Sequence, residues 1–161
     1  NILVNNAGIL QLGSVDEFSL EDFDRMFAVN VRATFAAAKA ASAVMRSGDR
    51  IISVGSVVAQ RSAFPGSSVY SMTKAAIAGM IRGLAIDFAP RGITVNNVQP
   101  GPTSTDMNPA DAPHADLIKS LVPLGRTGTA DEIAGMVAYL ASEEAAFVTG
   151  ASLSIDGGYL A

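Results

Sequence analysis

Tyr70 and Lys74 are the residues whose types and spacing most clearly indicate chemistry. They lie four positions apart in a helix-forming run, and residues at this spacing are neighbours on one helical face. A phenol has a reference pKa of about 10, so it exchanges protons poorly at neutral pH unless a nearby positive charge favours its anion. Lys74 is placed to supply that charge. Taken alone, the pattern is also typical of an exposed tyrosine packed on a lysine stem. Other motifs in the chain are needed to distinguish a catalytic pair from this surface pair.

The elements that position this pair alternate along the chain. Short apolar runs bounded by polar and glycine residues are typical of buried parallel strands, and they occur at 2–4, 50–54, 94–98 and 152–155. Capping residues and following prolines or glycines predict helices over about 20–45, 69–88 and 130–141. The order βαβαβαβ predicts a Rossmann-like, doubly wound α/β fold with a parallel sheet between two helical layers.

Polar and glycine residues follow three of the predicted strands directly. Asn5-Asn6-Ala7-Gly8 follows the first strand, Gly55-Ser56 the second and Pro100-Gly101 the third. In parallel sheets of this class, ligands bind beyond the carboxyl ends of the strands. Three strand ends therefore indicate one ligand-binding crevice.

These motifs, with Asn30 between them and Asp156-Gly157-Gly158 near the end, resemble the short-chain dehydrogenase/reductase family along the whole chain. The resemblance implies an NAD(P)-dependent oxidoreductase that interconverts a carbonyl and a secondary alcohol by hydride transfer. It also implies a small-molecule substrate and a homodimer or homotetramer. Within the family, the chain is most similar to bacterial 3-oxoacyl carrier-protein reductase-like enzymes and to cyclic-di-GMP-linked biofilm-dispersal reductases.

The resemblance assigns a role to each of four catalytic candidates. Tyr70 would be the general acid or base, and Lys74 would lower the Tyr70 pKa and bind the nicotinamide ribose. Ser56 would hold the substrate oxygen by a hydrogen bond that strengthens as negative charge develops. Asn30 would interrupt its helix and hold a water that links Lys74 to solvent. Without the resemblance, Asn30 would be read as an amide on a helix surface.

Ser56 departs slightly from the family pattern, because one residue more than is commonest separates it from Tyr70. It still aligns by its strand. Ser53 is the alternative, but it lies inside the strand, where a plain strand hydroxyl is the better interpretation. Ser67 and Ser68 follow a turn predicted at Pro65-Gly66.

Two loops resemble the family's cofactor-binding segments and add residues to Tyr70 and Lys74. The first would line the adenine ribose side with Asn5, Ala7 and Gly8, although Asn5 is as easily explained as a structural tie between strands. The second would meet the nicotinamide carboxamide. Its matching residues are Pro100, Gly101, Thr103 and Thr105, with Thr103 replacing the usual aliphatic residue.

The family's opening strand and glycine-rich turn, whose amides receive the pyrophosphate, have no counterpart in this sequence. The chain corresponds to strands 4 to 7 of the family fold, as a single partial domain over 1–161. The residue that selects NAD or NADP belongs to the part without a counterpart, so either cofactor is possible. The first strand would then be an exposed apolar edge, and we expect the 161 residues alone to bind dinucleotide weakly.

Composition narrows the possible partners. The net charge is −4 without a lysine or arginine cluster, which disfavours nucleic acid, and Arg32 and Lys39 interrupt the most apolar stretch, which disfavours a membrane span. Absent cysteines suit a cytoplasmic protein. The lone His114 and the lack of ligand spacing predict no metal site.

Three expectations concern larger parts of the chain. Residues 103–122 would form a lid or short helical insertion. Small residues at Ala76, Gly79 and Gly83 would suit a helix contact, either within the chain or with another copy. The alternative functions are a non-catalytic protein that binds a nucleotide or cyclic dinucleotide, and an inactive fragment.

Overall fold

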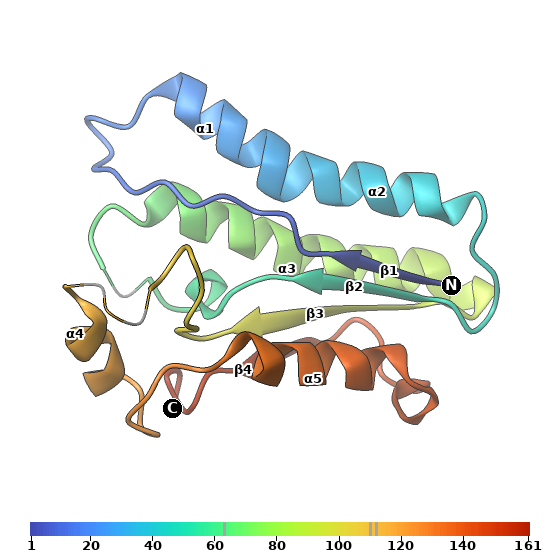
Figure 1. The fold of residues 1–161 in the computed structure, drawn as a ribbon. Helices are drawn as coiled ribbons and strands as arrows, with labels where there is room; N and C mark the ends of the chain where they lie inside the picture. The colour runs from blue at the N-terminus through green and yellow to red at the C-terminus, as the bar shows by residue number, and fades with distance from the viewer. Residues whose placement is uncertain (63, 110, 112) are drawn as a thin grey trace.

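Four strands form one parallel sheet in the computed structural model, which describes residues 1–62, 64–109, 111 and 113–161. The strands β1 (Ile2–Asn5), β2 (Arg50–Val54), β3 (Thr94–Pro100) and β4 (Ser152–Ile155) lie side by side in chain order (Figure 1). Because all four run in the same direction, their carboxyl ends meet at one edge. The loops predicted to form the site start at that edge.

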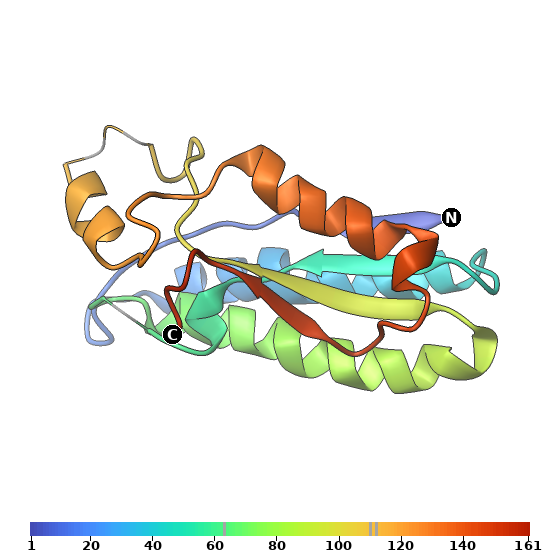
Figure 2. The same cartoon turned by 90° about the horizontal axis from the view of Figure 1, so that it is seen from below.

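Helices cover both faces of the sheet, as Figure 2 shows. One face carries the crossover from β1 to β2 together with α3, and the opposite face carries α5. The elements on the first face are α1 (Leu20–Phe27), a π-helical segment (Ala28–Arg32), α2 (Ala33–Ser42) and α3 (Ser68–Phe88). α5 spans Ala130–Ala141, and the short α4 spans Ala115–Ser120. The predicted doubly wound α/β fold is confirmed.

Side chains that alternate along the central strands build two cores. Ile51 and Val95 face α3, where they pack with Ile77 and Ile81 in one buried cluster. Their neighbours Ile52 and Val98 point to the opposite face and pack against Leu140 of α5. Burying a side chain of this size contributes roughly 1.5–3 kcal/mol, so both layers are held firmly against β2 and β3.

The edge strand β1 is less protected. Ile2 and Val4 remain 55% and 43% exposed. A cavity of about 270 Å³ lies beside them, and it is lined by residues of β1, the following loop, the π-helical segment and α2. The exposed apolar edge that the sequence predicts is therefore present.

Two predictions of local structure need comment. The helix expected over 20–45 consists of three segments and ends at Ser42. Of the predicted lid, the described residues include α4 and a bridge between Thr103 and Gly128, whereas positions 110 and 112 lie outside them. Within the described part of the chain, the helices are too short or too polar to cross a bilayer.

Candidate functional site

Tyr70 and Lys74 lie in the first turns of α3, beside the carboxyl end of β2. The Lys74 ammonium is 5.6 Å from the centroid of the Tyr70 ring. It also donates a 3.1 Å hydrogen bond to the carbonyl of Val54, the last residue of β2. Lys74 is buried, with 6% of its surface exposed. α3 and β2 together therefore hold its ammonium beside Tyr70.

Burial changes the proton affinity of both groups. It lowers the pKa of Lys74 to about 8, because the cation loses solvation. It raises the pKa of Tyr70 above the ordinary value of a phenol, and the Ser56 hydroxyl partly counters this rise. The net direction for Tyr70 is opposite to the lowering that the sequence predicts from Lys74. At neutral pH the phenol is therefore protonated and can donate a proton.

Ser56 is brought to Tyr70, as predicted. Its hydroxyl lies close enough to the phenol to lower the Tyr70 pKa. The same oxygen accepts a 3.3 Å hydrogen bond from the amide of Val58 at the start of a 3-10 turn, Val57–Ala59. Ser53 instead lies buried within β2, where the Asn5 amide reaches its hydroxyl at 3.4 Å. The structure therefore pairs Ser56, rather than Ser53, with Tyr70.

Asn30 is a buried anchor. It lies in the π-helical segment, where the chain departs from α-helical hydrogen bonding, as the resemblance implies. Its Oδ1 accepts from the Ile9 amide at 2.8 Å, and its Nδ2 donates to the Ile9 carbonyl at 2.9 Å. The same Nδ2 donates to the Thr73 hydroxyl at 3.1 Å. The side chain is fully buried, so the reading of Asn30 as a surface amide is wrong.

Gly8 brings the loop after β1 to the same place. A Cβ on Gly8 would lie 3.5 Å from Lys74 Nζ and 3.6 Å from Asn30 Oδ1. The Gly8 backbone therefore lines the space next to the lysine ammonium. Ala7 and Asn5 line the cavity beside β1 instead, and Asn5 also ties β1 to β2 through Ser53.

The loop after β3 is held by its own polar groups. Gly101 donates its amide to the Ile155 carbonyl at 3.0 Å, so it continues the pairing between β3 and β4. The Thr103 hydroxyl donates to the Gly101 carbonyl at 2.9 Å. Thr105 exchanges two backbone hydrogen bonds with Asn108. Pro100 is the last residue of β3, so the four predicted loop residues lie at or just beyond the carboxyl edge of the sheet. None of them has a described contact with Tyr70 or Lys74.

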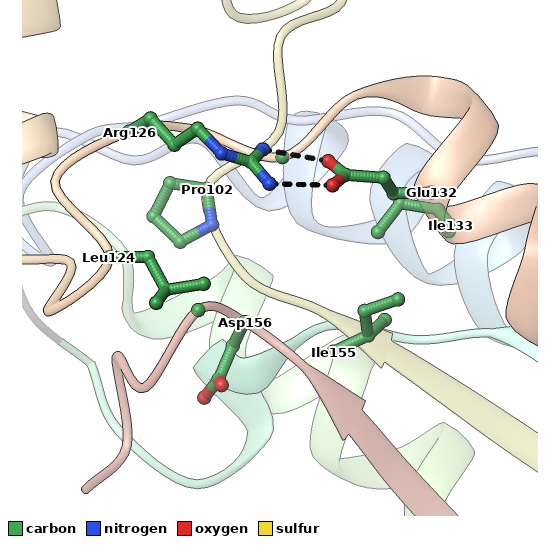
Figure 3. Close-up of a pocket in the computed structure, with 9 residues that line it drawn as sticks. Pro102, Leu124, Arg126, Glu132, Ile133, Ile155 and Asp156 are labelled. Carbon is green, nitrogen blue, oxygen red and sulfur yellow. Dashed lines mark hydrogen bonds and ion pairs between the residues drawn. The ribbon is translucent and has the colours of Figure 1, made fainter.

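A second cavity, of about 280 Å³, lies behind this loop on the side of α5 (Figure 3). Pro102, Leu124 and Ile155 supply apolar walls. An ion pair closes one side: Arg126 donates to both carboxylate oxygens of Glu132 at 2.8 and 2.6 Å, and the guanidinium lowers the Glu132 pKa to about 2. No catalytic candidate lines this cavity. In the described part of the chain, no three His, Asp or Glu side chains are grouped to hold a metal ion.

Two buried polar features escaped the sequence analysis. Thr73 is fully buried and bonded to Asn30, and Asn97 is fully buried next to Gly55. Asn97 belongs to a polar row that crosses the sheet in register at Asn5, Ser53, Asn97 and Ser152. The sequence signal was a polar residue in the middle of an apolar run, which is visible for Asn97 but not for Thr73 on a helix.

Comparison with known proteins places this geometry in a family. A family model described as enoyl-(acyl carrier protein) reductase matches residues 1–160. The structure of a short-chain dehydrogenase/reductase from Serratia marcescens is 54% identical, with a TM-score of 0.97. The chain belongs to the short-chain dehydrogenase/reductase family.

Two further members of the family are similarly close. A short-chain dehydrogenase from Burkholderia cenocepacia, solved in complex with NADP, is 48% identical with a TM-score of 0.98, and the match covers 100% of this chain and 66% of that one. A cyclic-di-GMP-binding biofilm dispersal mediator protein from Escherichia coli is 48% identical over 99% of this chain and 67% of its own length. The Serratia match covers 99% of this chain and 65% of that one. The chain thus spans about two thirds of the length of these relatives.

Proposed function

We propose that the protein containing these residues is an NAD(P)-dependent oxidoreductase that interconverts a carbonyl compound and a secondary alcohol. The observation that carries the proposal is the convergence of a buried lysine and a serine hydroxyl on one phenol. Tyr70, Lys74 and Ser56 come from two elements at the carboxyl edge of the sheet. Such an arrangement suits proton transfer to an oxygen atom, and membership of the family supports the same reading.

Each residue then has a task in carbonyl reduction. Tyr70, protonated at neutral pH, donates its proton to the oxygen of the substrate. Ser56 donates a hydrogen bond to the same oxygen and stabilises the negative charge that develops there. Lys74 keeps a positive charge near the phenol, which favours the phenolate left after the transfer. A nicotinamide cofactor, when bound, would supply the hydride for reduction or accept it in oxidation, where Tyr70 would take the alcohol proton as the base.

The residues present fit one end of such a cofactor. An ammonium group can donate three hydrogen bonds, and one donor of Lys74 goes to Val54. The remaining donors lie next to Gly8, whose missing side chain leaves the backbone close to Nζ. Lys74 and Tyr70 would therefore hold the ribose at the nicotinamide end. The NADP complex of the Burkholderia relative supports the binding of a nicotinamide cofactor.

The first test is cofactor-dependent turnover. NADH and NADPH are titrated separately against a short 3-oxoacyl ester, with the 161-residue chain and with the full natural protein. We expect turnover by the full protein and its loss on Tyr70→Phe. Tyr139→Phe is the matched control, because Tyr139 lies on α5 and is 44% exposed. Equal turnover by the two variants would contradict the role of Tyr70.

A second candidate is binding of a cyclic dinucleotide, which the name of the Escherichia coli relative favours. Such a ligand carries two phosphates, and arginines usually recognise phosphate groups. The cation described beside Tyr70 is a lysine and not an arginine, so we rank this candidate second. Titration calorimetry with cyclic-di-GMP, in the presence and absence of NADPH, separates the two: binding without any turnover of carbonyl compounds would favour the second candidate.

A further inference from the structure

Thr73 connects residues that the proposed function uses, without touching the place where a substrate would react. It lies on α3 between Tyr70 and Lys74 and is fully buried. Its hydroxyl donates to the Tyr70 carbonyl at 2.8 Å and accepts from Asn30 Nδ2 at 3.1 Å. A helix needs neither bond, because its own backbone already satisfies that turn.

The contact continues through Asn30 to a third segment. Asn30 is bonded through both Oδ1 and Nδ2 to the backbone of Ile9, at 2.8 and 2.9 Å. Ile9 follows Gly8, whose backbone lies next to Lys74 Nζ. A continuous chain of hydrogen bonds therefore joins the Tyr70 turn of α3, the π-helical segment and the loop after β1.

The lysine lies between two of these segments. One side is the bond from Lys74 to Val54 of β2, and the other is Gly8, which precedes the Ile9 backbone held by Asn30. If Thr73 lost its hydroxyl, Asn30 would keep Ile9 but would no longer be tied to the helix that carries Lys74. The separation between Gly8 and Nζ would then be set by packing alone.

We infer that Thr73 is a positioning residue, whose hydroxyl fixes Asn30 and the Gly8–Ile9 backbone against the turn of α3 that carries Tyr70 and Lys74. The inference rests on the proposed oxidoreductase function for its kinetic consequence, but the contact itself is independent of it. A small misplacement of catalytic groups reduces turnover by up to about 100-fold. We therefore expect the loss to appear in kcat, since no contact of Thr73 reaches the substrate.

The experiment compares Thr73→Val with Thr73→Ser in the full natural protein. Valine keeps the shape and removes the hydroxyl, whereas serine keeps the hydroxyl and removes the methyl group. We expect Thr73→Val to lower kcat roughly 10- to 100-fold with little change in the KM for the carbonyl substrate, and Thr73→Ser to restore most of it. Wild-type kcat in Thr73→Val, or an equal loss in Thr73→Ser, would overturn the inference.

Amide hydrogen exchange at Ile9, measured without cofactor, gives a second readout that needs no turnover. We expect faster exchange in Thr73→Val and wild-type exchange in Thr73→Ser. If the wild-type protein reduces no substrate, the proposed function fails, but this exchange pattern would still support the positioning contact. Unchanged exchange in Thr73→Val would reject the positioning contact. If the valine variant does not fold, Thr73→Ala replaces it in the same comparison.

Discussion

At the scale of single residues, Lys74 shows that the site is built at the expense of stability. Its ammonium is buried with one acceptor among the described residues, and this burial lowers its pKa from 10.5 to about 8. The folded state therefore disfavours the cation relative to the unfolded chain. Below about pH 8 this penalty is fully present. Between about pH 8 and 10.5 the folded protein releases the proton first, so stability rises with pH.

Replacing Lys74 by methionine should therefore stabilise the protein and abolish turnover. At pH 7 we expect the free energy of unfolding to rise by about 1–3 kcal/mol, since each unit of pKa shift corresponds to about 1.4 kcal/mol. The gain should shrink as pH rises from about 8 to 10.5. Chemical denaturation without cofactor at several pH values measures this. Lys39→Met on the exposed side of α2 is the control, and a Lys74→Met protein less stable than wild type at pH 7 would refute the argument.

At the scale of elements, the site depends on where helices and strands depart from regularity. The π-helical segment lets Asn30 reach inward to Ile9 and Thr73. β3 ends at Pro100, and Gly101 lies so close to the residue after β4 that a Cβ would be 2.6 Å from Asp156 Cα. The irregular positions make the contacts between separate segments. The regular helices and strands around them keep those segments fixed.

Much of this level could be predicted from the sequence. The four strands follow apolar runs, and the caps at Ser19 and Thr129 form as their residue types indicate. The contacts of Asn30 and Thr73 could not be predicted, because they join residues 21 and 43 positions apart. A sequence pattern records local preference, whereas these bonds depend on how the loop after β1, the π-helical segment and α3 pack. The direction of the Tyr70 pKa was missed for the same reason, since burial decides it.

Gly101→Ala tests the close contact at the end of β3. The added methyl group meets the backbone of Asp156, directly after β4, which cannot rotate away, so the loop must move. We expect a loss of about 1–3 kcal/mol in the free energy of unfolding and a lower apparent affinity for NADPH. Gly128→Ala is the matched control in the same region, because its Cβ would have ordinary contacts of 3.7 Å or more. Equal stability of the two variants, measured by denaturation, would show that the contact is not restrictive.

At the scale of the whole molecule, apolar side chains remain exposed at several places, and two of them lie on elements that could meet another chain. One is the edge of β1, with Ile2 and Val4. The other is the outer side of α3, where Met72 and Ile86 are 46% and 75% exposed. Gly83 lies on this side with nothing within 4 Å of its Cβ position, so the described part of the chain gives it no neighbour. Of the two explanations for the small residues of α3, we therefore test a contact with another copy.

Gly83→Trp tests whether this side of α3 is a contact between copies. A tryptophan would project from the helix and block the close approach of a second helix, so we expect the dimer or tetramer to dissociate. Gly135→Trp is the control, because Gly135 also lies in a helix, α5, with nothing within 4 Å of its Cβ position. Analytical ultracentrifugation of the full protein measures both variants and the wild type. Dissociation by Gly83→Trp alone would locate the contact on α3. An unchanged oligomer in both variants would show that the copies do not meet around Gly83.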